Sequence, residues 1–153
     1  MVDAVLAARP GFTELERIYS FFDVNAATSA VSAALIANPD LKLIVASNGP
    51  DGIGAAAAVK AAGLAGQVTV VAFDAVPPEI DGLKEGVITA LIAQSPAQIG
   101  AESVQAIVDY LQAGNTGAVP ASDEFVGIPQ RLLTADNVDD AANADYIYKP
   151  QCD

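Results

Sequence analysis

The sequence of 153 residues contains no histidine, no tryptophan and a single cysteine, Cys152. Without histidine the chain cannot build a Ser-His-Asp triad, and one cysteine excludes an internal disulfide and a Cys/His zinc site. Cys152 lies next to the C-terminus, close to Lys149. We expect it to be a tail residue without a function rather than a reactive thiol, because Lys149 is the one basic residue near it.

Basic residues are scarce, with 7 Lys and Arg against 19 Asp and Glu, so the formal net charge is −12 at pH 7. This balance repels phosphate backbones and anionic membrane surfaces, which argues against nucleic acid as a partner. Apolar runs are also short. None approaches the roughly 20 residues that a transmembrane helix needs, so we expect no membrane insertion. The first residues lack the basic region of a signal peptide. The length predicts one domain, or a piece of a larger one.

Apolar runs of strand length alternate with helix-like segments along the chain, which is typical of βαβ units and a parallel sheet. We therefore predict an α/β fold with an open, mainly parallel sheet and helices on both faces. The predicted strands are 15–21, 43–47, 68–73, 87–93 and, more weakly, 125–133. The predicted helices are 1–8, 26–37, 54–62, 78–85 and 96–112. Residues 136–153 are acidic and weakly patterned, which predicts a surface tail.

A glycine-rich turn follows the second predicted strand, where Gly52, Gly54 and Ala57 fit the dinucleotide-binding pattern G-x-G-x-x-A. Asp74 follows at about the distance of the acid that binds a ribose in such units. However, residues 48–51 separate the strand from the first glycine, and they are acidic. A pyrophosphate must lie directly on the helix N-terminus after the strand. Glycines in such turns also serve close packing, so a nucleotide-binding enzyme of the Rossmann type is only a minor alternative.

Three consecutive predicted strands end in a polar residue: Asn48, Asp74 and Gln94. Residues just past the carboxyl ends of parallel strands line the ligand crevice of an open sheet. Amide and carboxylate groups exchange hydrogen bonds with hydroxyl groups without acting as acid, base or nucleophile, which suits a polyol. Phe21 and Phe22 end the first predicted strand, where a ring can stack on a sugar. Core packing is the alternative for the two rings, and a helix cap is the alternative for Asp74.

The most informative run is IANPDLKLIVASNGPDGIGAAAAVKAAGLAGQVTVVAFDAVPPEIDGLKEGVITALIAQSPAQIG, residues 36–100. It contains NPD before a strand, then VVAFDAVP, LKEG and ALIAQSP followed by IG. With these motifs the chain resembles, from about Phe12 to Asn137, the C-terminal half of periplasmic sugar-binding proteins of the ribose-binding type. The resemblance implies a solute-binding component of an ABC transporter. Such a protein binds a sugar or polyol in a crevice between two lobes, without catalysis and without a cofactor. It also implies an ABC transporter permease as partner and a location in the periplasm or at the extracellular face.

The resemblance assigns roles to four residues. It implies that Asn48, Asp74 and Gln94 bind sugar hydroxyls and that Phe22 stacks on the sugar ring. The family often has Asn-Asp where this chain has Asn48-Gly49, so the identity of the sugar stays open. Effector-binding domains of lactose-repressor-like regulators share the fold and are an alternative. The motif ALIAQSPAQIG is closer to the transport proteins, and the sequence contains no DNA-binding headpiece.

Members of the resembled family are about twice as long, with two lobes joined by a hinge. The resemblance implies that residues 1–94 are a C-terminal-lobe portion without its first strand. Residues 95–116 would be a crossover helix that packs on the missing N-terminal lobe, and 117–153 a return strand and acidic tail. In the usual strand order, 2-1-3-4-5, the absent strand is central, so residues 15–21 would lack a neighbour. We therefore expect a fold that is incomplete alone and is covered by the missing lobe, a second copy or an exchanged segment.

Overall fold

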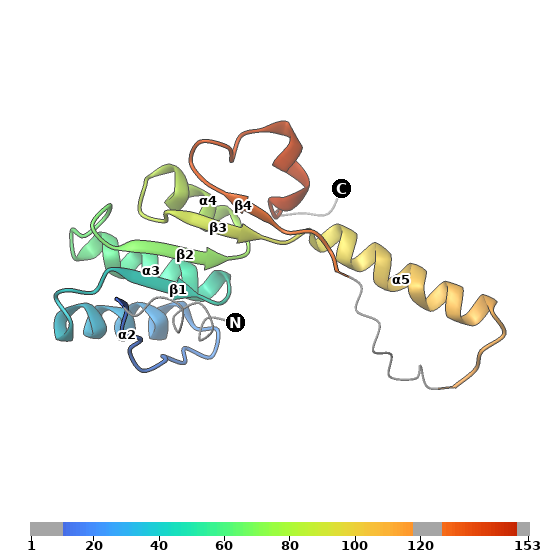
Figure 1. Cartoon of the computed structure of the whole chain (residues 1–153), viewed down its shortest axis with the longest axis horizontal. Coiled ribbons are helices and arrows are strands. Elements are labelled where there is room, and N and C mark those ends of the chain that lie inside the picture. Colours follow the sequence, from blue (N-terminus) through green and yellow to red (C-terminus); the bar gives the residue numbers. More distant parts are fainter. Residues whose placement is uncertain (1–10, 118–126, 150–153) are drawn as a thin grey trace.

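The computed structural model describes residues 11–117 and 127–149, which form a four-stranded sheet with helices against it (Figure 1). The strands are β1 (Leu43–Ala46), β2 (Thr69–Phe73), β3 (Ala90–Ala93) and β4 (Arg131–Leu133), in the spatial order β1-β2-β3-β4. β1, β2 and β3 are parallel, and β4 is antiparallel to β3. The sheet is therefore open and mainly parallel, as predicted, but in the described residues helices cover only one of its faces and not both.

Each parallel connection passes through a helix. The helices are α2 (Val24–Ala37), α3 (Gly49–Ala61), α4 (Pro77–Lys84) and α5 (Pro96–Gln112), followed by the short 3-10 helix η1 (Ala141–Tyr146). α3, α4 and α5 each have a proline in the first turn, where its fixed φ fits the helix and its missing N–H costs nothing. α3 contacts β1 and β2, α4 contacts β3, and α2 packs along α3. α3 begins earlier than predicted, because Asn48 caps it directly after β1.

The hydrophobic core lies between the sheet and the helices α3 and α4. Side chains alternate along each strand, so one face of the sheet supplies most of this core. Its most deeply buried large members come from β2, β3, β4, α3, α4 and the segment before η1: Val59, Val70, Leu83, Leu91, Leu133 and Val138. α3 contributes mainly alanine and glycine to this contact, which lets the helix lie close to the strands.

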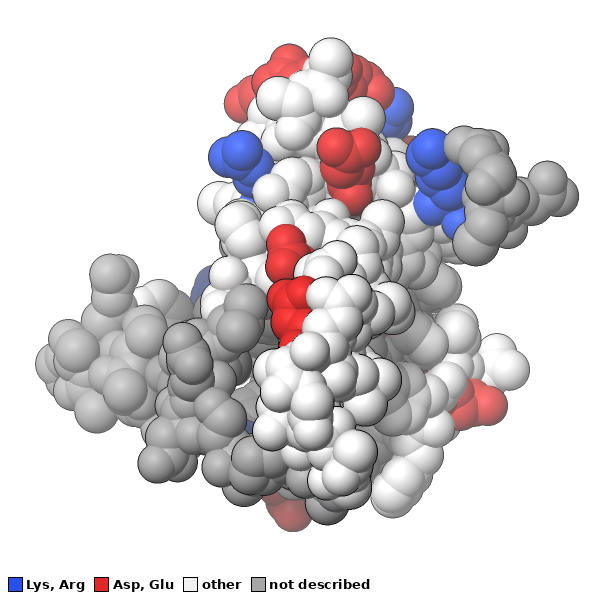
Figure 2. All heavy atoms as spheres, turned by 90° about the vertical axis from the view of Figure 1, so that its right-hand side faces the viewer, with Lys and Arg blue, Asp and Glu red and all other residues white. Residues whose placement is uncertain are grey.

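In the described part of the chain, one face of the sheet and one side of α5 are apolar and uncovered, in addition to the exposed apolar side chains of residues 12–22. The open sheet face, opposite α3 and α4, exposes Leu43, Val45 and Leu132. The α5 stripe consists of Ile99, Val104, Ile107, Val108 and Leu111, all exposed. α5 extends away from the sheet, and none of its residues is buried (Figure 1). From the side toward which α5 extends, most of the described surface carries neither acidic nor basic side chains (Figure 2). Both uncovered surfaces agree with the expectation that the fold of this chain is incomplete alone.

The predicted strand at residues 15–21 is wrong. The segment contains no strand, and it leads into a turn in which Phe21 and Phe22 have φ angles of 55° and 64°. A strand needs a neighbour for its backbone hydrogen bonds. The described sheet ends at β1, and no strand lies beyond it to pair with this segment. The apolar pattern was present, but the neighbouring strand was not.

The predicted surface tail is also wrong for its described part, residues 136–149. Val138 is only 1% exposed and belongs to the core, against which Ile147 packs. Asn143 is buried and donates a hydrogen bond to the Asn137 carbonyl at 2.9 Å. The Tyr148 N–H donates to the Ala75 carbonyl at 3.0 Å. The acidic residues of this segment lie on its outer side, and these few anchors hold it against the sheet.

Some predictions fall outside the described residues. These are the helix at 1–8, the tail end with Cys152, and the first two residues of the strand predicted at 125–133. In the described part of that predicted strand, residues 127–130 form no strand and only the end is one, as β4. Among the residues that the structure describes, no helix is both long and apolar enough to cross a membrane.

Candidate functional site

Asn48, Asp74 and Gln94 lie at the carboxyl ends of three adjacent strands. Asn48 comes two residues after β1, and Asp74 and Gln94 directly follow β2 and β3. The three strands are parallel, so their ends meet at one edge of the sheet, near the start of α5 (Figure 1). All three side chains are half-buried. The structure thus brings the three predicted polar residues to the same edge.

Asn48 caps α3 with its own side chain. Its Oδ1 accepts from the Asp51 N–H at 3.0 Å, and its Nδ2 donates to Asp51 Oδ2 at 2.7 Å. The cap satisfies a backbone N–H that the first turn of a helix leaves without a partner. A primary amide has two N–H donors and an oxygen with two lone pairs. Nδ2 also donates to the Ser47 hydroxyl at 3.2 Å, so Asn48 is held in one orientation and keeps one lone pair of Oδ1 for a ligand.

Asp51, which the sequence analysis did not single out, links the parts of this edge. Its carboxylate accepts from the hydroxyls of Ser20 and Ser47 and from the amide of Asn48. Ser20 is buried and lies two residues before Phe22, so this carboxylate ties the phenylalanine turn to the start of α3. An acidic residue in the first turn of a helix also interacts favourably with the helix dipole. The place of Asp51 at the start of a predicted helix was the only sign of this role in the sequence.

Asp74 receives two hydrogen bonds from distant parts of the chain. Oδ2 accepts from the Gly49 N–H at 3.0 Å, and Oδ1 accepts from the Tyr148 hydroxyl at 2.9 Å. Its φ is 80°, in the left-handed region that aspartate tolerates better than most residues. The helix-cap alternative is thus met in part, although the capped helix is α3 and not the following α4. Each carboxylate oxygen keeps a second lone pair for a ligand.

The ring of Phe22 is exposed, and the side chain of Gln94 has unused hydrogen-bonding groups. Phe22 is 73% exposed and Phe21 is 89% exposed, so the core-packing alternative is wrong for both rings. Within the described residues the Gln94 side chain makes no hydrogen bond. Both groups can therefore meet a ligand without first breaking a contact.

Glu79 is a buried carboxyl that sequence reasoning missed. It is fully buried, its Oε2 accepts from the Val76 N–H at 3.2 Å, and its Oε1 has no partner among the described residues. Burial raises the pKa of Glu79 to about 8; the Val76 N–H lowers it, and the charge of Asp74 raises it further. Glu79 is thus neutral at pH 7. A glutamate in the first turn of a helix usually faces solvent, so the sequence carried no signal for this burial.

Tyr148 is the second missed residue, because it comes from the segment predicted to be a tail. Burial raises the pKa of Tyr148 to about 12, and the hydrogen bond to Asp74 and the charges of Asp74 and Glu79 act in the same direction. The phenol therefore stays protonated and remains a hydrogen-bond donor at physiological pH.

Gly52 and Gly54, which matched the dinucleotide pattern, are explained by packing. A Cβ at Gly52 would collide with Glu79 Oε1 and lie 2.8 Å from the Ala72 Cβ. A Cβ at Gly54 would lie 2.5 Å from the Ala27 Cβ. The first glycine lets α3 approach β2 and α4, and the second lets it approach α2. The side chains at the start of α3 are carboxylates and an amide, which is unfavourable for a diphosphate.

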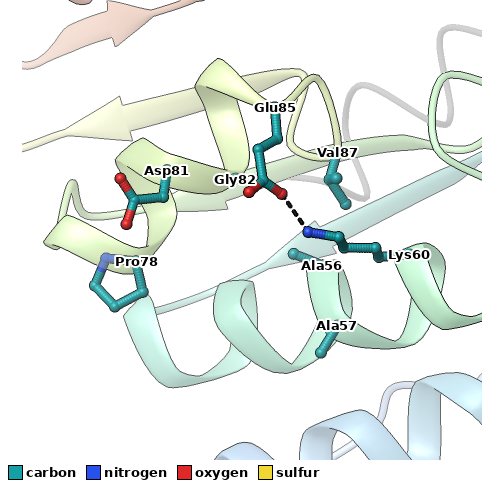
Figure 3. Close-up of a pocket in the computed structure, with 8 residues that line it drawn as sticks. All are labelled: Ala56, Ala57, Lys60, Pro78, Asp81, Gly82, Glu85 and Val87. Atoms are coloured by element: carbon teal, nitrogen blue, oxygen red, sulfur yellow. Dashed lines mark hydrogen bonds and ion pairs between the residues drawn. The ribbon is translucent and has the colours of Figure 1, made fainter.

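A hollow in the described surface lies elsewhere, between α3 and α4 (Figure 3). It measures about 230 Å³, and the ion pair between Lys60 and Glu85 crosses it at 2.5 Å. None of the four predicted site residues lines it. In the described ranges there is also no group of three or more Cys, Asp or Glu residues that could hold a metal ion.

Comparison with known proteins gives a consistent result. Residues 1–116 match the family model of the periplasmic binding protein domain. The chain is 35% identical over 97 residues to the D-allose-binding periplasmic protein of Escherichia coli (strain K12), an alignment covering 63% of this chain and 31% of that protein. It is 35% identical over 114 residues to the D-ribose/D-allose-binding protein of Pseudomonas aeruginosa, covering 74% and 35%.

Solved structures give the same picture. An ABC transporter solute binding protein from Agrobacterium vitis, bound with alpha-D-tagatopyranose, superposes with a TM-score of 0.86 at 35% identity, covering 97% of this chain and 48% of that one. A second from the same organism, with bound D-fucose, gives a TM-score of 0.84 at 25% identity, covering 95% and 48%. The chain thus spans less than half the length of each of these proteins.

Proposed function

Because this chain belongs to the periplasmic binding protein family, we propose that it is the C-terminal-lobe portion of a solute-binding component of an ABC transporter. It binds a sugar or polyol and does not catalyse a reaction. The observation that carries this proposal is the meeting of Asn48, Asp74 and Gln94 at one sheet edge. The names of its relatives, which bind allose and ribose, support the same ligand class.

Each site residue has a distinct role in this proposal. Asp74 accepts hydrogen bonds from sugar hydroxyls through its remaining lone pairs. Asn48 accepts through the remaining lone pair of Oδ1, while Gln94 both donates and accepts. The ring of Phe22 stacks on the apolar face of the sugar. Hydrogen bonds that involve a charged group contribute roughly 1.5 to 3 kcal/mol each, so Asp74 contributes most. No cofactor or metal is needed.

A second surface must close the crevice. The open sheet face and the α5 stripe are apolar and exposed, which is unfavourable in water. We infer that an N-terminal lobe, or failing that a second copy of this chain, covers them and supplies the other half of the sugar contacts. We use the term native assembly for this chain together with the N-terminal lobe or second copy that covers these two surfaces. Its further partner is an ABC transporter permease, and its place is the periplasm or the extracellular face.

Two other classes of function agree less well with these observations. An effector-binding domain of a lactose-repressor-like regulator shares the fold, but the relatives reported above are named as binding and transport proteins. A nucleotide-binding enzyme is disfavoured because Asp51 and Asp74 occupy the start of α3, where a phosphate would lie. The glycines of that turn are accounted for by packing.

A thermal-shift screen of the native assembly tests the proposal. The panel contains D-allose, D-ribose, D-tagatose, D-fucose and D-arabinose, with NAD and a flavin as comparison ligands. A ligand that binds only the folded state stabilises it by RT ln(1 + [L]/Kd), about 2.7 kcal/mol at a hundred times Kd. We expect at least one sugar to raise the melting temperature. Stabilisation by NAD or flavin, with none from any sugar, would reject the proposal.

A further inference from the structure

The segment that follows η1 returns to the sheet edge and contacts Asp74 and its neighbour. The Tyr148 hydroxyl donates to Asp74 Oδ1 at 2.9 Å, and the Tyr148 N–H donates to the Ala75 carbonyl at 3.0 Å. One residue therefore binds both the side chain of Asp74 and the backbone just after it. None of the site residues inferred from the sequence lies in this segment.

The two donors on Asp74 act on different oxygens. The Gly49 N–H binds Oδ2 at 3.0 Å, while the Tyr148 hydroxyl binds Oδ1. A carboxylate held at both oxygens cannot rotate freely about its last bond, so the directions of its remaining lone pairs are fixed. Binding sites gain affinity and selectivity when such groups are oriented before the ligand arrives.

The Tyr148 side chain is itself held on a rigid support. Val138 and Ile147 anchor the segment in the core, and Asn143 is hydrogen-bonded to the Asn137 carbonyl. The Lys84 ammonium forms an ion pair with Asp139 at 2.6 Å. The phenol is therefore positioned by packing and not by a loose tail.

From this geometry we propose that Tyr148 is a positioning residue of the sugar site, whose hydroxyl fixes the Asp74 carboxylate in the orientation that accepts sugar hydroxyls. The inference rests on the proposed function, because it needs Asp74 to contact the sugar. The phenol oxygen keeps its own lone pairs while it donates to Asp74. The pair thus presents acceptors in two fixed directions, which selects among sugars that differ only in the direction of a hydroxyl.

The direct test is Tyr148→Phe, which removes the hydroxyl and keeps the ring. The matched control is Tyr146→Phe, since Tyr146 lies in the same segment and its ring contacts Arg131 instead of Asp74. Calorimetric titration of the native assembly with D-ribose and D-arabinose, which differ only in the direction of the hydroxyl at C2, measures the affinities. We expect Tyr148→Phe to weaken binding about two- to tenfold, because the sugar must then immobilise the Asp74 carboxylate itself, and to reduce the ratio of the two affinities. Tyr146→Phe should leave both unchanged.

A double variant separates positioning from a general structural role. If Tyr148 acts through Asp74, Tyr148→Phe should weaken binding by less than about twofold when Asp74→Ala, which removes both carboxylate oxygens, is already present. A full repeat of its effect there would overturn the inference, as would unchanged or stronger binding in Tyr148→Phe alone. If Asp74→Ala leaves the affinity for every sugar unchanged, the proposed function fails. If Asp74→Ala abolishes binding and Tyr148→Phe does not weaken it, only the inference fails.

A spectroscopic measurement keeps the inference testable if Tyr148→Phe does not fold. The chain has 4 tyrosines, so replacing Tyr19, Tyr110 and Tyr146 by Phe leaves Tyr148 as the one tyrosine. A sugar that binds beside the Tyr148–Asp74 hydrogen bond should shift the tyrosine absorbance of this variant in a saturable way. Saturable binding by calorimetry without any change in absorbance would overturn the inference.

Discussion

The buried carboxyl of Glu79 lies directly against Gly52, and the missing side chain of Gly52 provides the space for it. A Cβ at Gly52 would collide with Glu79 Oε1 and lie 2.8 Å from the Ala72 Cβ. Helices α3 and α4 and strand β2 therefore meet at one point just behind the proposed sugar site. The contact also raises the pKa of Glu79, because it removes the carboxyl from water.

We expect Gly52→Ala to lower the free energy of unfolding by roughly 1 to 3 kcal/mol, the usual cost of overpacking a core. The matched control is Gly100→Ala in α5, where an added Cβ meets nothing within 4 Å. That change should be neutral or slightly stabilising, because alanine favours the helix. Chemical denaturation of the two variants measures the difference. A Gly52→Ala protein as stable as the wild type would contradict the close approach of Glu79.

Glu79 should make the stability of the fold depend on pH. Its pKa is about 8 in the folded chain against an ordinary value of 4.5, so the folded state holds a proton that the unfolded state releases between these values. This contribution to stability is complete below pH 4.5 and is lost as the pH rises toward 8, with a slope of up to roughly 1.4 kcal/mol per pH unit. In Glu79→Gln that slope should disappear.

The measurement is a series of melts from pH 4.5 to 9 on wild type, Glu79→Gln and the exposed control Glu102→Gln. The high net negative charge affects all three proteins alike, so the difference between wild type and Glu79→Gln isolates one carboxyl. Parallel curves for these two proteins would show that Glu79 is ionised in the folded state. The curve of Glu102→Gln should follow the wild type.

The sequence predicted the parts of the site that depend on local pattern and on topology. Asn48, Asp74 and Gln94 each end an apolar run, and parallel strands place such ends at one edge. Asp51, Glu79 and Tyr148 were missed because their roles arise from contacts that no local pattern encodes. Tyr148 and Asp74, for example, are 74 residues apart.

The incorrect predictions have a related cause. An apolar run favours a strand, but residues 15–21 have no strand beside them in the described sheet. An acidic composition favours a surface tail, but Val138 and Ile147 suffice to anchor residues 136–149 to the core. In both cases the structure of the segment depends on which other part of the protein it can pack or pair with. The composition of the segment does not encode this. The exposed Phe21 and Phe22 follow the same rule, since their turn lies outside the core.

Asp74 should affect both sugar affinity and stability. In the native assembly, Asp74→Asn keeps the shape but removes the charge and one acceptor, so affinity should fall about ten- to a hundredfold, or roughly 1.4 to 2.8 kcal/mol. Asp74→Ala should lower the sugar affinity further. Because Asp74 accepts hydrogen bonds from Gly49 and Tyr148, its replacement should also lower the free energy of unfolding without ligand by about 1 kcal/mol or more.

Calorimetric titration and a melt without ligand on the same two variants measure the two effects. The control is Asp81→Asn, an exposed acid on α4 that lines the hollow between α3 and α4 and not the sheet edge. Loss of stability with unchanged sugar affinity in Asp74→Ala would make Asp74 a helix cap only. Unchanged stability would contradict the two hydrogen bonds.

The apolar surfaces predict that this polypeptide does not exist as a compact monomer. The α5 stripe and the open sheet face expose several large apolar side chains, which favours association with another surface. Light scattering at micromolar concentration should therefore give a dimer, or a complex with a second lobe. Ile107→Glu, in the middle of the α5 stripe, should weaken this association because it buries a charge at the contact. Gln105→Glu adds the same charge to α5 outside the stripe and should leave the association intact. A compact monomer of the wild type, with no bound fragment by intact mass, would show that these surfaces need no partner.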